Sequence, residues 1–185
     1  MNKILKRTLI GFAAATALCV AAGGYFALKL FDPGLPQNLA VLGPVRLTNE
    51  AGLPVRLSET VLPRSATLVA FWATWCAPCR KEAVEIAALR RKYRASDLSI
   101  LYLNVDDVPN ATATSAFLRA SHAENLRVFY AGHSGWKSIT GSSSMALPRS
   151  YIFDRKGMAT AVFSGFDESD SKSEMERSLT KALAS

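Results

Sequence analysis

Two cysteines separated by two residues stand where a continuous apolar segment gives way to a helical pattern. The apolar segment, Thr67–Ala73, is rich in residues that favour β-structure, and such a run is typical of a central strand buried on both faces. Ala77–Tyr93 then carries apolar residues at helical spacing, with charged residues over much of the remainder, which indicates an amphipathic helix. Cys76 and Cys79 therefore lie at a strand-to-helix junction, and this placement constrains both the fold and the chemistry.

The junction predicts different roles for the two thiols. Cys76 precedes the helix, where unpaired backbone N–H groups and the helix dipole favour negative charge, so its thiolate is stabilised and nucleophilic. Cys79 lies one turn further in, where it is sheltered and can attack a mixed disulfide to release the product. Pro78 suits the first helical turn, because the N–H that proline lacks has no helical partner there. We expect a redox-active disulfide with Cys76 as nucleophile and Cys79 as resolving thiol.

Two other uses of the cysteine pair are open at this point. A purely structural disulfide would close so short a loop that it would stabilise the fold by only about 2 kcal/mol in the chain-entropy model. A zinc site would need two further ligands, for which the soluble part offers only His122 and His133. Three cysteines and two histidines in the whole chain are too few for a disulfide scaffold or a zinc ribbon. The sequence therefore favours redox chemistry, and we expect no metal and no cofactor.

The N-terminal end has the pattern of a membrane anchor. Met1–Arg7 contains three positive charges, and an uncharged run then extends to Leu28. As a helix, Leu9–Leu28 would be about 30 Å long, the thickness of the hydrocarbon core of a bilayer. The positive end favours the cytoplasm, so the chain beyond it would be exported to the periplasmic or extracytoplasmic side. We expect residues 1–30 to form an uncleaved single-pass signal anchor in the cytoplasmic (inner) membrane; the small residues of Val20–Ala22 leave a cleaved signal as the alternative.

Charge and composition exclude several classes of protein. The formal net charge is +7, from 22 basic and 15 acidic residues, and four of the basic residues lie in the predicted anchor: Lys3, Lys6, Arg7 and Lys29. The others are not clustered as a nucleic-acid-binding face requires, so we expect no nucleic-acid partner. With 49% apolar and 20% charged residues, the chain has the balance of a globular domain, which excludes a disordered, a collagen-like and a polytopic membrane protein.

The remaining pattern alternates strands and helices. Residues 31–43 are rich in proline and glycine and predict a linker, and the domain that follows, residues 44–185, opens with a hairpin signal in Val45–Leu47 and Val55–Leu57. Buried strands that alternate with helices and end in an antiparallel hairpin indicate an α/β domain with a mixed sheet. Beyond the cysteines we expect, in chain order, a strand at Ser99–Val105, a helix at Thr112–Ala120 and a strand at Arg127–Tyr130. Gly132–Ser144 predicts a loop with at most one helical turn. A hairpin of Arg149–Phe153 and Met158–Phe163 and a helix at Ser169–Leu183 complete the domain.

A longer motif surrounds the cysteines: Trp75-Cys76-Ala77-Pro78-Cys79-Arg80-Lys81-Glu82, within Thr67–Leu89. This stretch resembles the thioredoxin superfamily, and the chain is most similar to its TlpA/ResA-like membrane-anchored thiol–disulfide oxidoreductases of bacteria. The resemblance covers most of residues 40–185. It implies a thioredoxin-like fold, with a mixed central sheet flanked by helices and an additional N-terminal β-hairpin.

The resemblance also implies a substrate-binding set near the cysteines. The family carries a cis proline beside them, which Pro148 matches, and the backbone before it, here Leu147, pairs with an extended substrate segment; an ordinary trans proline is the alternative. By its position beside Cys76, rather than by the resemblance, Trp75 is expected to add a contact surface. After the proline, members usually place a small hydroxyl residue, whereas this chain has Arg149. Its guanidinium would either lie near Cys76, where it stabilises the thiolate or selects an acidic partner, or point to solvent.

A third candidate catalytic residue is Glu82. It lies one helical turn after Cys79 and can face the same side. Related members carry a glutamate here that tunes the buried thiol and shuttles protons, and a partly buried carboxyl with a raised pKa suits that task. In thioredoxin itself the buried acid lies on the strand six residues before the first cysteine, a position that is Ala70 in this chain. The alternative is a solvated charge on the helix face.

Together these features predict an exported disulfide reductase. Its partners would be exported proteins with disulfides, of the kind handled in cytochrome c maturation or oxidase copper-site assembly, and a membrane thiol-transfer protein as electron donor. An oxidase that forms disulfides is one alternative, because the direction depends on the reduction potential. A copper-binding chaperone is another, although such members of the superfamily usually space their cysteines one residue further apart and add a nearby histidine.

Overall fold

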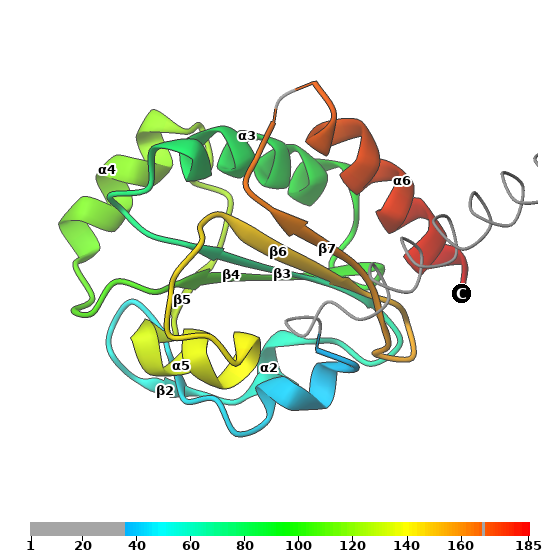
Figure 1. The fold of residues 1–185 in the computed structure, drawn as a ribbon, viewed down its shortest axis with the longest axis horizontal. Coiled ribbons are helices and arrows are strands. Elements are labelled where there is room, and N and C mark those ends of the chain that lie inside the picture. The colour runs from blue at the N-terminus through cyan, green and yellow to red at the C-terminus, as the bar shows by residue number, and fades with distance from the viewer. Residues whose placement is uncertain (1–35, 168) are drawn as a thin grey trace, which may run out of the picture. The chain divides into compact units, whose positions relative to one another are not determined.

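The computed structural model describes residues 36–167 and 169–185, which form an α/β domain. The strands are β1 (Leu47–Thr48), β2 (Pro54–Val55), β3 (Ala66–Trp72), β4 (Leu98–Asn104), β5 (Val128–Tyr130), β6 (Arg149–Phe153) and β7 (Ala159–Ser164). The helices are η1 (Leu39–Leu42, a 3-10 helix), α2 (Leu57–Thr60), α3 (Ala77–Lys92), α4 (Ala111–Ala120), α5 (Gly132–Thr140) and α6 (Ser171–Ala184). The strands form a single sheet in the order β2-β1-β5-β4-β3-β6-β7. Helices α3, α4 and α6 cover one face, while η1, α2 and α5 lie on the other (Figure 1).

Strand β3 is the centre of the sheet and leads to the cysteine junction. All seven of its residues are buried. It pairs in parallel with β4, where Trp72 lies opposite Asn104, and antiparallel with β6, where Phe71 lies opposite Arg149. The sheet is therefore mixed and flanked by helices, which confirms the predicted fold class. The carboxyl ends of β3 and β4 and the start of β6 meet at one edge of the sheet.

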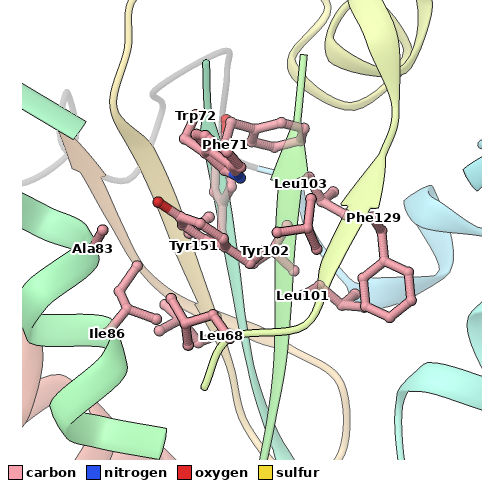
Figure 2. Close-up of a cluster of buried hydrophobic side chains, with 14 of the residues drawn as sticks. Leu68, Phe71, Trp72, Ala83, Ile86, Leu101, Tyr102, Leu103, Phe129 and Tyr151 are labelled. Atoms are coloured by element: carbon pink, nitrogen blue, oxygen red, sulfur yellow. The ribbon is translucent and has the colours of Figure 1, made fainter. Parts of the chain in front are cut away.

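Apolar packing fixes α3 against the sheet. Figure 2 shows Ala83 and Ile86 extending from α3 toward Leu68 on β3, whereas Phe129 lies on the side away from α3. All four side chains are buried. Burial of a large aliphatic or aromatic side chain contributes about 1.5–3 kcal/mol, so these contacts hold the middle of α3 against β3.

Helix α5 contradicts the prediction that Gly132–Ser144 is mostly irregular. Its nine residues are helical, and its C-cap is Gly141, whose φ of 70° lies in the left-handed region that favours glycine. Trp136 and Ile139 are buried, and the Trp136 ring packs edge-on against Phe71 with centroids 5.4 Å apart. Glycine and serine are weak helix formers. The prediction was wrong because the burial of this apolar face outweighs local propensity.

A short antiparallel pair extends the sheet at the position of the predicted N-terminal hairpin. Strands β1 and β2 pair over two residues each. The Asn49 side chain closes the turn between them by accepting hydrogen bonds from the backbone N–H groups of Ala51 at 3.0 Å and Leu53 at 2.9 Å. Thr48 also pairs with Tyr130 of β5, which joins the pair to the rest of the sheet.

The first described residues attach at the end of the sheet opposite the cysteines. Asn38 forms a bridge with Met158, and the Leu39 N–H donates to the Gly157 carbonyl at 2.8 Å, both in the turn between β6 and β7. Because β6 runs antiparallel to β3, this turn lies where β3 begins, whereas Cys76 lies beyond the point where β3 ends. The two segments thus occupy opposite poles of the sheet.

The predicted anchor, residues 1–30, lies outside the described residues, as does the first part of the predicted linker. The chain divides into residues 1–33 and residues 34–185 as separate units. Within residues 36–167 and 169–185, no helix combines the length and the apolar character that a membrane span needs.

Candidate active site

The two cysteines form a disulfide at the start of α3. Cys76 is the N-cap of the helix, and its Sγ accepts a hydrogen bond from the Cys79 N–H at 3.3 Å. Cys79 is wholly buried, whereas Cys76 keeps 4% of its surface exposed. Pro78 lies in the first turn, as predicted. The strand-to-helix junction is therefore confirmed, and of the two cysteines the predicted nucleophile is the one that keeps some exposed surface.

An acidic residue at the end of the neighbouring strand holds the loop before the disulfide. The Thr74 N–H donates to both carboxylate oxygens of Asp106, at 3.2 and 3.4 Å. Asn104, which is buried, donates to the same carboxylate at 3.0 Å and accepts from the Asp106 N–H at 2.9 Å. This network ties the loop between β3 and α3 to β4. Sequence reasoning missed it, although an aspartate directly after a buried strand is the signal that could have indicated it.

The proline next to the site has the cis peptide bond that the resemblance implies. Leu147–Pro148 is cis, which confirms that expectation over a trans turn. Pro148 is buried and Leu147 is half-buried. Since the next residue, Arg149, pairs with Phe71 near the end of β3, the cis bond lies at the same edge of the sheet as the disulfide.

Glu82 is inside the protein rather than on a solvated helix face. Only 1% of its surface is exposed, and its Oε1 accepts a hydrogen bond from the Ser150 hydroxyl at 2.7 Å. Burial raises the pKa of Glu82 to about 7, although the Ser150 hydrogen bond acts in the opposite direction. The carboxyl lies one turn after Cys79 on α3, and both side chains are buried. The Glu82 carboxyl, which can gain and lose a proton near neutral pH, therefore lies one helical turn after the buried Cys79.

An aromatic cluster includes one neighbour of Glu82, the phenol of Tyr102. Trp72 stacks on Tyr102 with ring centroids 4.8 Å apart and also contacts Phe117 at 4.4 Å. All three are buried. Burial and the nearby Glu82 charge raise the pKa of Tyr102 well above its ordinary value, so the phenol stays neutral. The stacked rings of Trp72 and Tyr102 are thus part of the buried core at the carboxyl ends of β3 and β4.

The remaining predicted contact residues differ in their exposure. Trp75, next to the disulfide, is 64% exposed. Arg149 is half-buried, and its guanidinium donates to the Tyr151 hydroxyl at 2.6 Å and to the Ser164 hydroxyl at 3.0 Å. These contacts hold the Arg149 side chain against β6 and β7. Its proposed effect on Cys76 stays a prediction.

Comparison with known proteins identifies the family of this chain. The Redoxin family model matches residues 39–179. The thiol-disulfide oxidoreductase ResA of Bacillus cereus is 27% identical over 181 residues, which cover 97% of this chain and 96% of that protein. The thioredoxin-like protein YneN of Bacillus subtilis is 31% identical over 113 residues, covering 60% of this chain and 62% of that protein.

Solved structures agree with this placement. The crystal structure of a putative thiol:disulfide interchange protein DsbE from Chlorobium tepidum matches with a TM-score of 0.63 and 26% identity, covering 80% of this chain and 99% of the other. StoA from Bacillus subtilis matches with a TM-score of 0.53 and 14% identity, covering 72% of this chain and 93% of the other, a likeness of fold. With its Cys76–Cys79 disulfide at the head of α3, the chain belongs to the Redoxin family and is a TlpA/ResA-like thiol–disulfide oxidoreductase of the thioredoxin superfamily.

Proposed function

We propose that this protein reduces disulfides of exported proteins while anchored in the cytoplasmic membrane, with its domain on the periplasmic or extracytoplasmic side. The observation that carries the chemistry is the graded access of three groups on one helix. Cys76, the N-cap, keeps 4% of its surface exposed, Cys79 is fully buried, and the buried Glu82 follows one turn later. Such an order separates the sulfur that meets a substrate from the sulfur that releases it. The charged and apolar pattern of the N-terminus supports export and anchoring.

The proposed reaction moves two electrons from the dithiol to the substrate. The Cys76 thiolate attacks one sulfur of the substrate disulfide, forms a mixed disulfide, and expels the other substrate sulfur as a thiolate. The Cys79 thiolate then attacks the Cys76 sulfur, releases the second substrate thiolate, and leaves the disulfide between Cys76 and Cys79. The substrate is reduced and the enzyme is oxidised. The helix N-terminus favours the first step because it stabilises negative charge on Cys76.

Glu82 is the proposed acceptor of the Cys79 proton. Cys79 must lose its proton before it can attack, and its sulfur has no exposed surface from which water could take that proton. A carboxyl with a pKa of about 7 is ionised in a substantial fraction of molecules at neutral pH and can still hold a proton afterwards. This balance suits a group that accepts and returns one proton in each cycle.

The proposed docking site consists of Trp75, Leu147 and Pro148, with Arg149 at its side. An extended substrate segment would pair with the backbone at Leu147 and rest on the exposed Trp75 ring. The proposed substrates are exported proteins of the cytochrome c maturation or oxidase copper-site type. A membrane thiol-transfer protein would return electrons to the oxidised enzyme.

Measurement of the reduction potential of the Cys76–Cys79 pair tests the direction. A strongly negative value, together with turnover of insulin disulfides, supports a reductase, whereas a value close to that of a dedicated oxidase contradicts it. Cys76→Ser should abolish turnover, and Cys79→Ser should accumulate the mixed disulfide. Cys19→Ser is the matched control, because Cys19 lies far outside the active-site motif in the sequence, and it should retain full activity.

A separate experiment tests the proposed location. The full chain should sediment with membranes after expression in a bacterium, and protease added outside the cytoplasmic membrane should degrade the domain. Intact mass of the membrane-bound protein distinguishes an uncleaved anchor from a cleaved signal. Recovery of the domain in the cytoplasm would contradict the proposal.

A further inference from the structure

A row of three side chains crosses the sheet beneath α3. Ala70, at the middle of β3, pairs with Ser150 of β6 on one side and with Tyr102 of β4 on the other. Residues that pair directly place their side chains on the same face of a sheet. Glu82 of α3 approaches this row from above, since the Ser150 hydroxyl donates to its Oε1 at 2.7 Å. The methyl group of Ala70 occupies little space, so a helix-borne carboxyl fits over the position where thioredoxin carries its strand acid.

The two hydroxyls that flank Ala70 differ in their relation to Glu82. Ser150 is hydrogen-bonded to the carboxyl. The Tyr102 hydroxyl and the second carboxyl oxygen, Oε2, are both buried without a hydrogen-bond partner among residues 36–167 and 169–185. A buried carboxylate needs donors, because the charged form loses its solvation by water. The Ser150 hydroxyl therefore bears directly on whether this carboxyl can carry a charge.

Few other charges face the carboxyl. Tyr102 approaches from β4 as a neutral phenol, Cys79 lies on the same helix, and β3 presents the apolar Ala70. On the neighbouring helix α6, Lys172 and Glu176 instead form ion pairs at the surface, with Glu85 and Lys92 of α3. Ser150 is thus well placed to control the carboxyl through a direct contact.

We propose that Ser150 is a positioning residue for the thiol–disulfide reaction: its hydroxyl holds the Glu82 carboxyl and stabilises its charged form. This inference rests on the proposed role of Glu82 as proton acceptor. Ser150 lies two residues after Pro148 on β6. Strand β6, which begins at the proposed docking site, therefore also contacts the proton acceptor through the Ser150 hydroxyl. A short segment of backbone thus connects the docking site with Glu82.

Titration of the Glu82 carboxyl in the oxidised full-length protein tests the proposal. In this state Cys76 and Cys79 do not titrate, and carbon-detected NMR of labelled glutamate follows the carboxyl directly. The wild-type midpoint should lie at about 7. Ser150→Ala should raise it by roughly one pH unit, because the charged form loses a donor. Ser150→Thr keeps the hydroxyl and should restore the wild-type midpoint.

Tyr102→Phe is the matched control, because it deletes the other buried hydroxyl beside Ala70 without removing a hydrogen bond to Glu82. Its midpoint should equal that of the wild type. Equal shifts in Tyr102→Phe and Ser150→Ala, or no shift in Ser150→Ala, would overturn the proposal. If Ser150→Ala does not fold, Ser150→Val and Ser150→Thr supply a pair of nearly equal shape that differs in the hydroxyl.

Turnover separates this inference from the function on which it rests. The midpoint of the rise of turnover with pH should move upward in Ser150→Ala by the same amount as the NMR midpoint. If Glu82→Gln turns over like the wild type, the proposed role of Glu82 fails, but the NMR titration still measures the effect of Ser150. A shifted NMR midpoint with an unshifted turnover profile would show that Ser150 affects the Glu82 carboxyl but has no role in the reaction.

Discussion

At the scale of single residues, helical spacing in the sequence predicts where the Glu82 carboxyl lies. Contacts from distant parts of the chain determine its surroundings and its pKa. Residues three apart lie on the same side of any helix, so the sequence could predict that Cys79 and Glu82 face the same side of α3. Burial of Glu82 and the raised pKa that results agree with the family-based expectation. The Ser150 contact could not be predicted, because it depends on the register of β6 against β3, which brings together residues far apart in the chain.

Replacement of Glu82 by glutamine should slow resolution of the mixed disulfide. Without the proton acceptor, the rate at neutral pH should fall by about a hundredfold. The wild-type rate should rise with pH through about 7 as Glu82 loses its proton, and the variant should lack this rise. Stopped-flow measurement of the second step across the pH range checks both effects. Glu85→Gln, on the same helix, is the control and should behave like the wild type.

Burial of Glu82 should also make stability depend on pH. Its pKa of about 7 in the folded protein compares with an ordinary value of 4.5, so between these values the folded state binds more protons than the unfolded state. The free energy of unfolding contributed by this group is therefore fully present below about 4.5 and is lost as pH rises through about 7.

The total loss should be about 3 kcal/mol, from the difference between the two pKa values. Chemical denaturation of the wild type and of Glu82→Gln at a series of pH values measures it. The stability of the variant relative to the wild type should increase over this range and then level off. A constant difference between the two proteins would contradict a buried, titrating carboxyl.

At the scale of elements, patterns with strong periodicity were predicted well and those set by distant partners were not. Strand β3 and helix α3 have continuous apolar or helical patterns, and the observed bounds differ from the predicted ones by about one residue. Helix α5 has a composition poor in helix formers and depends on Trp136 packing against Phe71. Since Phe71 lies far from it in the chain, sequence periodicity could not reveal that contact.

A larger side chain at Gly135 should disturb α5. A Cβ atom there would lie 2.7 Å from the Ala131 Cβ and 3.2 Å from the Val45 Cγ1. Gly135→Ala should therefore lower the free energy of unfolding by about 1–3 kcal/mol despite the better helix propensity of alanine. Ser134→Ala, at the exposed neighbouring position, should be neutral or slightly stabilising. Denaturant unfolding compares the two, and equal effects would argue against the packed helix.

The loop before the disulfide should loosen when Asp106 is removed. Asp106→Ala deletes the acceptor of the Thr74 N–H and should cost about 1–2 kcal/mol of stability. Hydrogen exchange at Thr74 should become faster. Asp107→Ala removes the same charge from the exposed neighbouring position and should change neither quantity. A matching effect of both variants would indicate a general charge effect instead.

At the scale of the whole molecule, the mixed sheet places the chemistry at one pole and the first described residues at the other. The fold class followed from alternating buried strands and helices, and the cis bond before Pro148 followed from the family resemblance. The long-range attachment of Asn38 to Met158 had no signal in the sequence, because it depends on backbone pairing rather than on side-chain pattern. Shortly after Asn38 in the chain, Leu42 is buried in the hydrophobic core.

A chain that begins at Pro36 should fold and exchange disulfides on its own. Its residues include every strand of the sheet, the two cysteines of the disulfide and Glu82. Its melting temperature and its rate of insulin reduction should match those of the full-length protein in detergent. A shorter chain that begins at Pro44 lacks the contact between Asn38 and Met158 and should be less stable. Equal stability of the two shortened chains would show that this contact contributes nothing.

The bridge between Asn38 and Met158 also determines how the domain can be handled in the laboratory. A chain that begins at Pro36, fixed to a bead or sensor chip through an added N-terminal tag, would be held by the pole at which β3 begins. The disulfide lies at the far pole, where the Trp75 side chain is exposed to the flowing solution. Partner proteins could therefore be trapped from an extract with immobilised Cys79→Ser protein, whereas a tag next to Trp75 would crowd the very surface that they must reach.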